Sequence, residues 1–263
     1  MITAAGSAPA APTGGYLDDS ALSIIKWTPP APALDSPVNL ADLAAYFTTR
    51  NLIGTPRGQS AQDDDVYLPP DVAPRFAGAL GVSLTKDNAP LVLAVVQFAQ
   101  KDLEALVKPV KKPRASGGRT RPYVQYPDLP ACPHDVDDQK FGLAGSGSYP
   151  STHAAVGWIW GAVLAELAPD KADAVIARGL EFGDSRLVCG FHYPSDLANG
   201  RLAAAALLAR LHADPKFQSD MVAAKAQLDA ARAGVKTDPL LVQKSLQKTL
   251  KARVVPQLVP DSQ

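Results

Sequence analysis

Hydrophobic residues recur at helical spacing along most of this chain. Leu40, Leu43 and Phe47 repeat at intervals of three and four behind Ser36-Pro37, a pair that suits the opening of a helix. No segment of useful length alternates polar with apolar residues, and no hairpin turn signal is present. Helical period or composition, between proline and glycine breaks, predicts further helices over residues 71–80, 87–107, 151–167, 171–182, 195–212, 217–233 and 239–250.

The pattern therefore predicts an all-α fold, a single-domain helical bundle over residues 16–263. Residues 1–15 are rich in Ala, Pro and Gly and are expected to form a disordered tail. The proline-rich strap at residues 28–32 is expected to be extended and to lie over the body of the domain. Hydrophobic residues make up 46% of the chain and charged residues 20%, the balance of a globular protein with a full core.

Charge and hydropathy exclude some classes of function. The 26 Lys and Arg residues equal the 26 Asp and Glu residues, and a net charge of zero argues against a general nucleic-acid binder. No apolar run reaches the roughly 18 to 20 residues that a membrane span needs. The first residues lack the basic and apolar regions of a signal peptide, so we expect the chain to be either cytosolic or exported with its signal removed. The Ala-rich helical surface at residues 203–206 is a candidate contact with a second copy, and we expect a homo-oligomer.

Two groups of residues stay ambiguous from spacing alone. Cys132 and Cys189 are too few for a disulfide scaffold or a cysteine zinc site, and either form one disulfide or remain two buried thiols. The run Asp63-Asp64-Asp65 could hold a metal ion, but no His or further acidic residue is interleaved. A solvated helix face or loop is therefore the expectation for this acidic run.

The candidate chemistry centres on residues 185–196, where Arg186, His192 and Asp196 stand at short spacings. Pro194 suits the first turn of a helix, which places His192 at a helix entrance and Asp196 within hydrogen-bonding reach of the imidazole. A carboxylate on one ring nitrogen leaves the other nitrogen free to attack or to donate. Arg186 adds a planar fork of donors that suits a phosphate-like oxyanion. Taken alone, the segment is equally well explained as a helix end with an incidental ion pair.

Two upstream segments favour the chemical reading. The cationic run over residues 108–122 ends in Arg121-Pro122, where proline fixes the backbone so that the guanidinium can be aimed. Residues 145–154 form a Gly-rich approach to a helix, with Ser151 as N-cap and His153 in the first turn, and a helix N-terminus of this kind binds anions. Each segment has a plainer explanation, a solvated basic loop or nucleic-acid patch for the first and a capped helix for the second.

Together the three segments supply oriented cations, a backbone anion cradle and two histidines. This set suits phosphoryl transfer through a phosphohistidine, and it needs no metal and no cofactor. Zinc bound by His192, His153 and Asp196 is the main rival, and it is disfavoured because several nearby cations would repel a dication.

The order Arg121-Pro122, then Pro150-Ser151-Thr152-His153, then Ser185-Arg186 with His192 and Asp196, resembles the phosphatidic-acid-phosphatase-type superfamily. This superfamily includes bacterial acid phosphatases and vanadium haloperoxidases. The strap at residues 27–32 and Asp42-Leu43 also resemble the soluble class A non-specific acid phosphatases. The resemblance implies a disulfide between Cys132 and Cys189, a periplasmic or secreted location, and an acid phosphatase that acts on small phosphomonoesters and releases inorganic phosphate.

Residue by residue, the resemblance implies that His192 is the nucleophile, that Asp196 holds its ring, and that His153 is the general acid and base. It implies phosphate binding by the residues that match the remaining motif positions, namely Arg121, Arg186, Ser151, Thr152 and either Arg114 or Lys112. Two departures stand out: Thr152 replaces the glycine that the family usually has between Ser and His, and Arg114 occupies the position of the family's lysine. If Gly117-Gly118 is an insertion, Lys112 fills that basic position instead. The rival functions are a vanadium-dependent haloperoxidase and a non-catalytic anion-binding module, while a lipid phosphatase is disfavoured because membrane helices are missing.

Overall fold

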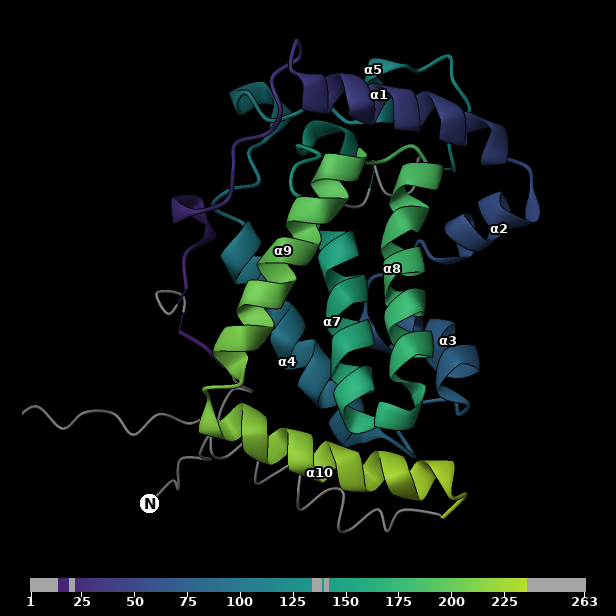
Figure 1. The fold of residues 1–263 in the computed structure, drawn as a ribbon, viewed down its shortest axis with the longest axis vertical. Coiled ribbons are helices and arrows are strands. Elements are labelled where there is room, and N and C mark those ends of the chain that lie inside the picture. The colour runs from purple at the N-terminus through teal and green to yellow at the C-terminus, as the bar shows by residue number, and fades with distance from the viewer. Residues whose placement is uncertain (1–13, 19–21, 134–138, 140–141, 236–263) are drawn as a thin grey trace, which may run out of the picture.

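The computed structural model of the protein describes residues 14–18, 22–133, 139 and 142–235. These residues contain nine α-helices and no β-strand, so the predicted all-α fold is confirmed for the part of the chain described (Figure 1). Of the tail predicted over residues 1–15, residues 1–13 lie outside the described residues, as does the helix predicted over residues 239–250. The single-domain assignment for residues 16–263 stays a prediction. The helices are α1 (Pro37–Thr49), α2 (Pro56–Asp63), α3 (Pro69–Leu80), α4 (Pro90–Val107), α5 (Pro122–Gln125), α7 (Thr152–Leu167), α8 (Ala172–Val188), α9 (Pro194–Leu211) and α10 (Pro215–Arg232).

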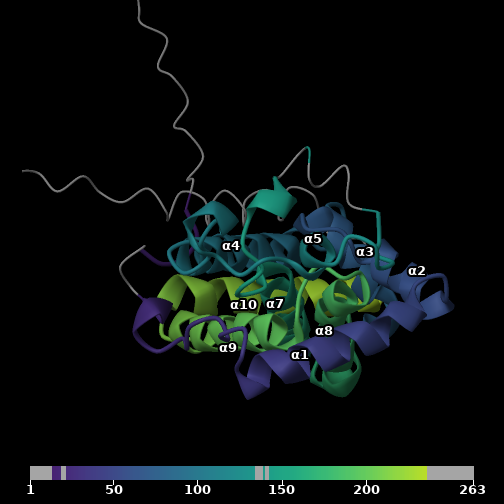
Figure 2. The same cartoon turned by 90° about the horizontal axis from the view of Figure 1, so that it is seen from above.

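Helix α7 is the centre of the bundle. It is apolar on nearly every face, and a helix of that kind is stable only when other helices surround it. It contacts α4, α8, α9 and α10, and Figure 2 shows it in a middle layer with α4 on one side and α8 and α9 on the other. The contact with α8 is close because both helices present glycine: a Cβ atom on Gly157 would lie 2.6 Å from the carbonyl oxygen of Gly179.

A column of aromatic rings runs from the core to one end of α7. Phe76 of α3 stacks on Trp160 of α7 with ring centroids 5.5 Å apart, and Phe182 of α8 lies beside Phe76 at 6.3 Å. His153, in the first turn of α7, stacks on Phe182 at 4.3 Å with the two ring planes nearly parallel. The hydrophobic core therefore extends up to one of the two candidate histidines.

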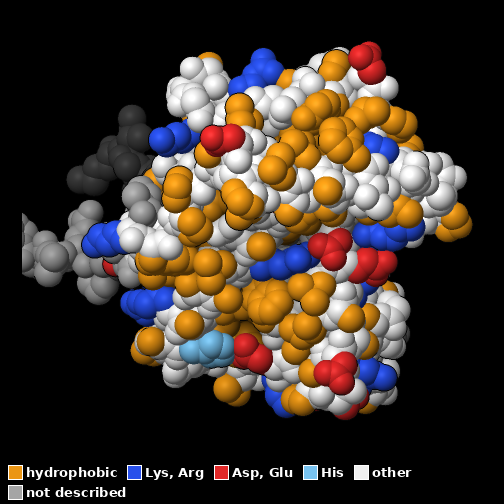
Figure 3. Space-filling model, turned by 45° about the horizontal axis from the view of Figure 1, so that its top comes forward, with side chains coloured by type: hydrophobic (Ala, Val, Ile, Leu, Met, Phe, Trp, Pro, Cys, Tyr) orange, Lys and Arg blue, Asp and Glu red, His pale blue; other side chains and the backbone are white. Residues whose placement is uncertain are grey.

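Helix α1 turns its polar face toward the protein. Asn39, Asp42 and Tyr46 are buried, whereas the side chains of Leu40 and Phe47 are exposed by 59% and 45%. Hydrophobic side chains gather on the face of the molecule that carries α1 (Figure 3). The predicted helix is present, and it is held by polar contacts with the body and by the buried ring of Tyr46, which packs against two further tyrosine rings.

The strap that precedes α1 lies against the body, as expected, and the Tyr149 hydroxyl donates to the carbonyl oxygen of Pro29 at 2.7 Å. The candidate contact at residues 203–206 is wrong in part, because Ala203 and Ala204 are fully buried in the core cluster. Their small side chains allow α9 to pack closely on the helices beside it.

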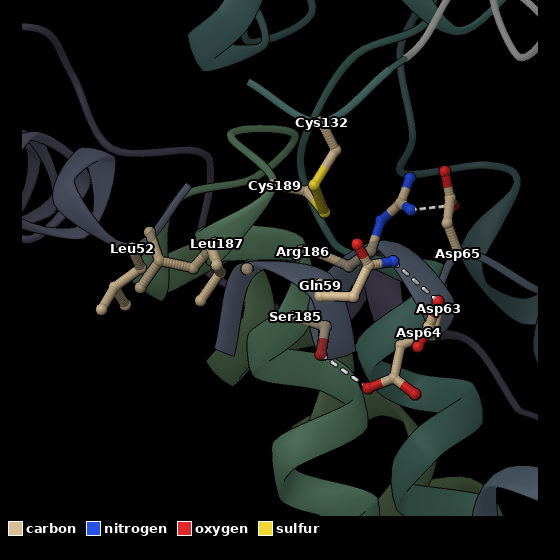
Figure 4. The surroundings of a disulfide bond; sticks show 12 residues. Leu52, Gln59, Asp63, Asp64, Asp65, Cys132, Ser185, Arg186, Leu187 and Cys189 are labelled. Atoms are coloured by element: carbon tan, nitrogen blue, oxygen red, sulfur yellow. Dashed lines mark hydrogen bonds and ion pairs between the residues drawn. A yellow bond between two sulfur atoms is a disulfide. The ribbon is translucent and has the colours of Figure 1, made fainter. Parts of the chain in front are cut away.

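The acidic run is not a solvated face. Asp64 is buried and accepts a hydrogen bond from the Ser185 hydroxyl at 2.7 Å (Figure 4). It also pairs with Arg178. Asp65 pairs with Arg186, as the dashed line in Figure 4 marks. The expectation of a solvated face or loop is therefore wrong for these two residues, and two of the three carboxylates of the metal alternative are engaged by arginine, while Asp63 is exposed. Neither partner could be seen from the sequence, since both arginines lie more than a hundred residues further along the chain.

Candidate active site

The three motif segments meet at one cavity of about 480 Å³. Thr152 and His153 reach it from the start of α7, and Arg186 from the last turn of α8, which continues six residues beyond the predicted end of that helix. His192 stands two residues before α9, and Arg121 immediately before α5. The wall is formed by Asp65, Val66, Tyr67, Leu68, Asp71, Lys111, Arg121, Leu143, Ser146, Thr152, His153, Arg186 and His192.

His192 is held between an arginine and a carboxylate. Its Nε2 atom lies 2.9 Å from a terminal nitrogen of Arg121, and its Nδ1 atom lies 3.4 Å from Oδ2 of Asp196. Because a guanidinium only donates, Nε2 must carry the lone pair and the ring proton must sit on Nδ1, facing the carboxylate. Burial, followed by the charges of Arg121, Lys111 and Arg186, holds the pKa of His192 well below its usual value, which keeps the ring neutral.

His153, in the middle motif at the start of α7, lines the same cavity. Its ring is buried against Phe182, and burial, then Arg186 and then His192, lowers its pKa well below the usual value. A backbone hydrogen bond with Asp64 opposes this shift in part. His153 is therefore neutral near pH 7, and a bound anion would raise its pKa.

The first turn of α7 offers backbone donors. Ser151 is fully buried and caps the helix, since its hydroxyl accepts from the Ala154 amide at 3.2 Å. Its side chain is not part of the cavity wall, unlike that of Thr152, which is half-buried there. The Ser151 amide donates to the backbone carbonyl of Asp196 at 2.9 Å, which joins the middle motif to the last one.

Arg186 and Arg121 occupy the cavity as predicted from the motif. Arg186 is buried, stacks over Phe191 with 4.3 Å between its guanidinium carbon and the ring centroid, and pairs with Asp65 at the cavity wall. Arg121 donates to Ser146 Oγ and to the carbonyl oxygen of Leu143, both at 2.9 Å. These contacts fix both guanidinium groups before any anion arrives.

The basic position before Arg121 is filled by a lysine that the sequence did not single out. Lys111 lines the cavity, and its ammonium donates to the Pro150 carbonyl at 2.8 Å. Burial of this ammonium, then the charge of Arg121, lowers its pKa well below the usual value. Arg114 and Lys112 are both exposed and lie outside the cavity wall. The expected choice between those two residues is therefore wrong as to which basic side chain reaches the cavity.

The reason is a bulge in the chain between Lys111 and Arg121. Residues Arg114–Ser116 form a short 3₁₀ turn, and the amides of Ser116 and Gly118 both donate to the carbonyl oxygen of Pro113, at 3.0 Å each. The chain thus leaves the body and returns to it within a few residues. Counting back from Arg121 therefore stops on the bulge, before the residue that reaches the cavity.

Comparisons with known proteins agree with this geometry. Residues 93–219 match the sequence model of the PAP2 superfamily. The chain is 35% identical over 211 residues to a non-specific acid phosphatase of Providencia stuartii, covering 80% of this chain and 83% of that protein. It is 36% identical over 214 residues to an acid phosphatase of Zymomonas mobilis (81% and 78%) and 32% identical over 208 residues to a non-specific acid phosphatase of Salmonella typhimurium (77% and 79%). This chain belongs to the PAP2 superfamily. Its relatives are the non-specific acid phosphatases.

This PAP2 protein has one disulfide, between Cys132 and Cys189, which decides between the two alternatives that spacing left open. Cys189 stands three residues before His192, and the Cys132 amide donates to the Cys189 carbonyl at 3.1 Å. Arg50 supports the same turn, since it donates to the carbonyl oxygens of Leu187 and Val188 at 2.6 and 2.8 Å. The approach to His192 is therefore fixed by the disulfide bond (Figure 4) and by the buried Arg50.

One charged residue of this PAP2 protein was missed entirely by sequence reasoning. Arg119 is buried and bridges two carboxylates, donating to Asp42 Oδ2 and to Asp196 Oδ1 at 2.7 Å each. Its guanidinium also lies over the ring of Tyr193 at 4.1 Å. Its place two residues before Arg121 was visible, but nothing local indicated that it turns away from the cavity to the far side of Asp196.

The described residues contain no cluster of three or more His, Cys, Asp or Glu side chains placed to hold a metal ion. None of their helices combines the length and apolar character that a membrane crossing requires.

Proposed function

We propose that this protein is an acid phosphatase that hydrolyses phosphomonoesters through a phosphohistidine on His192. The observation that carries the proposal is the arrangement around that ring: Nε2 faces the cavity beside Arg121, while Nδ1 faces Asp196. His153 faces the same space from another helix. Lys111, Arg121 and Arg186, with the first amides of α7, surround the place where a phosphoryl group would sit.

In the first step, Nε2 of His192 attacks phosphorus and the bond from phosphorus to the ester oxygen breaks. Protonated His153 gives its proton to that oxygen, so that a neutral alcohol leaves. Arg121 must exchange its contact with Nε2 for the oxygens of the phosphoryl group. The positive charge that develops on the His192 ring is stabilised by Asp196 at Nδ1.

In the second step, water attacks phosphorus and the bond from phosphorus to Nε2 breaks. Neutral His153 now takes a proton from the water, and inorganic phosphate is released. The cations and the α7 amides act in both steps, because phosphoryl transfer depends mainly on positioning and on neutralising the charge of the equatorial oxygens.

The acidic preference follows from His153. Its pKa lies well below the usual value, so at neutral pH and above too little of it is protonated to donate. A phosphate dianion raises that pKa in the complex. We therefore expect kcat/KM, which reports ionisation of the free enzyme, to fall as the pH rises above neutrality.

The decisive experiment is single-turnover labelling with a ³²P phosphomonoester, quenched in alkali. Wild-type protein should trap an acid-labile, alkali-stable label, and His192→Ala should trap none and lose turnover of p-nitrophenyl phosphate. His153→Ala should lose far more activity on an alkyl phosphate than on p-nitrophenyl phosphate, because p-nitrophenolate is a good leaving group without protonation, whereas an alkoxide is not. Label that persists in His192→Ala would refute the assignment.

Two additions to the same assay test the rivals. EDTA should leave the rate unchanged if no metal takes part, and strong inhibition would favour the zinc alternative. Vanadate should inhibit as a phosphate analogue, whereas halide oxidation on adding vanadate and peroxide would indicate a haloperoxidase.

Three further properties belong to the same proposal. Transfer of the phosphoryl group to an alcohol in place of water is expected, and is measured by product analysis with added glycerol. An oxidising location, periplasmic or secreted, is supported by the disulfide and is tested by cell fractionation. A homo-oligomer is tested by light scattering.

A further inference from the structure

The polar face of α1 reaches the back of the candidate active site through three buried charges. Asp42 accepts from Arg119, and Arg119 donates in turn to Asp196, with both contacts at 2.7 Å. The three side chains are exposed by no more than 6%. Although burial lowers it, the two carboxylates raise the pKa of Arg119 above its ordinary value, so the guanidinium stays charged.

The charges of the three linked side chains, Asp42, Arg119 and Asp196, do not cancel one another. If Asp196 met Arg119 alone, the pair would be neutral, and the His192 ring would face no net negative charge. Asp42 supplies the second carboxylate, so the three groups together carry one negative charge. Asp196 Oδ2 lies 3.4 Å from Nδ1 of His192 and also accepts from the Tyr193 amide at 2.9 Å, so the ring feels this charge as a close electrostatic contact.

We propose that Asp42 and Arg119 are positioning residues that set the negative charge Asp196 presents to His192. The inference rests on the proposed function, because the charge matters most when the ring becomes positive on attacking phosphorus. Asp42 does so from a distance, through Arg119, and touches neither the ring nor the substrate. A purely structural role, in which Asp42 only fastens α1 to α9, is the alternative.

That alternative has support, because Asp42 also accepts from the amide and the hydroxyl of Ser195 at 2.9 and 2.5 Å. The two roles differ in what a change of charge does. A fastening contact can be loosened by any substitution, and loosening has no preferred sign of electrostatic effect. A charge-setting contact responds in opposite directions to the loss of a carboxylate and the loss of a guanidinium.

Other groups also act on the His192 ring, and they stay constant in the test. They come from every element around it, namely Lys111 after α4, Arg121 before α5, His153 on α7, Arg186 on α8 and Asp196 on α9. Differences between variants of Asp42 and Arg119 therefore report the three-charge chain alone.

The test compares Asp42→Asn, Arg119→Gln and the double variant with wild type. Asp42→Asn makes the chain neutral, Arg119→Gln leaves it doubly negative, and the double variant restores a single negative charge on Asp196. The acid limb of the kcat/KM profile on p-nitrophenyl phosphate reports ionisation of the free enzyme. We expect it to move to lower pH in Asp42→Asn and to higher pH in Arg119→Gln, by roughly half a pH unit each, and to return in the double variant.

Phosphate affinity gives a second readout that needs no turnover. Titration calorimetry with inorganic phosphate should show tighter binding by Asp42→Asn and weaker binding by Arg119→Gln, each by a few-fold. Asp42→Asn should nevertheless turn over about tenfold more slowly, because the positive ring of the phosphohistidine has lost support. Tighter binding combined with slower turnover is the signature that a loosened scaffold does not produce.

Matched controls separate charge from packing. Ser195→Ala removes the hydroxyl that donates to Asp42 and accepts from Arg119, so it loosens both residues without changing charge and should leave the acid limb in place. Asp170→Asn and Arg232→Gln break an exposed ion pair on another surface and should match wild type. If Asp42→Asn and Arg119→Gln shift the limb in the same direction or leave it unchanged, the inference is overturned. A wild-type protein without turnover would defeat the proposed function instead, and the phosphate affinities would still decide the inference.

Discussion

Replacing Lys111 with methionine tests the assignment on which sequence and structure disagree most. Methionine keeps the length and most of the volume of the side chain and removes only the charge and its donors. The ammonium lies in the cavity with Arg121 and Arg186 and is held by the Pro150 carbonyl at 2.8 Å. If the cavity binds a phosphoryl group, Lys111→Met removes one of the three cations on its wall.

The size of the effect can be bounded in two ways. A charge pair at about 4 Å with an effective dielectric constant of about 20 is worth roughly 4 kcal/mol. Removal of one preorganised donor to a developing oxyanion costs about 2.7–4 kcal/mol, or about 10²–10³ in rate. Because Arg121 and Arg186 remain, we expect the lower end, a loss of about 100-fold in kcat/KM.

The assay is kcat/KM on p-nitrophenyl phosphate at acidic pH, with Lys112→Met and Arg114→Met as matched controls. Both control side chains are exposed and outside the cavity, and salt screens exposed charges over about 10 Å at 0.1 M ionic strength. We expect both to stay within about threefold of wild type. The reasoning fails if either control loses as much activity as Lys111→Met, or if Lys111→Met is as active as wild type.

Three further predictions concern stability. Because burial depresses the pKa of His153 and His192, the unfolded chain binds more protons than the folded one below about pH 6.5. The phosphate-free protein should therefore lose stability as the pH falls from 7 to 5, and added phosphate should restore it. Thermal melting temperatures that stay constant across this range would contradict this prediction. Cys132→Ser opens a crosslink across 57 residues and should lower the free energy of unfolding by about 4 kcal/mol, measured by denaturant titration; a midpoint equal to wild type would count against it. Gly200→Ala places a Cβ atom 2.1 Å from the Ser151 carbonyl oxygen and should destabilise by about 1–3 kcal/mol, whereas the control Gly78→Ala, with open space around it in α3, should stabilise by up to about 1 kcal/mol; equal melting temperatures for the two would refute the close crossing of α7 and α9.

Much of the fold could be predicted because local signals agree with it. Proline stands at the start of α1, α4 and α9, and the apolar period of α4 matches its buried face. Arg121, His153, Arg186 and His192 were singled out from three short motifs, and the structure brings all four to one cavity.

What failed depended on contacts that no short stretch records. The partners of Asp64 and Asp65 are arginines on α8, and a run of three acids looks solvated until those partners are known. The period of Leu40 and Phe47 predicted the helix α1 but not its orientation, since the buried contact between Asp42 and Arg119 belongs to the face that turns inward. Lys111 was missed because counting back from Arg121 assumes a fixed number of intervening residues, and the bulge that contains Arg114–Ser116 adds residues between the two.

The stack of His153 on Phe182 links the acidity of the site to the hydrophobic interior. Phe182 is fully buried and lies beside Phe76, so one face of the imidazole is covered by side chains without polar atoms. A smaller apolar residue at 182 would admit solvent to one face of the ring and raise its proton affinity. The working pH range of the protein is therefore adjustable from within the core, with every polar group of the cavity left in place.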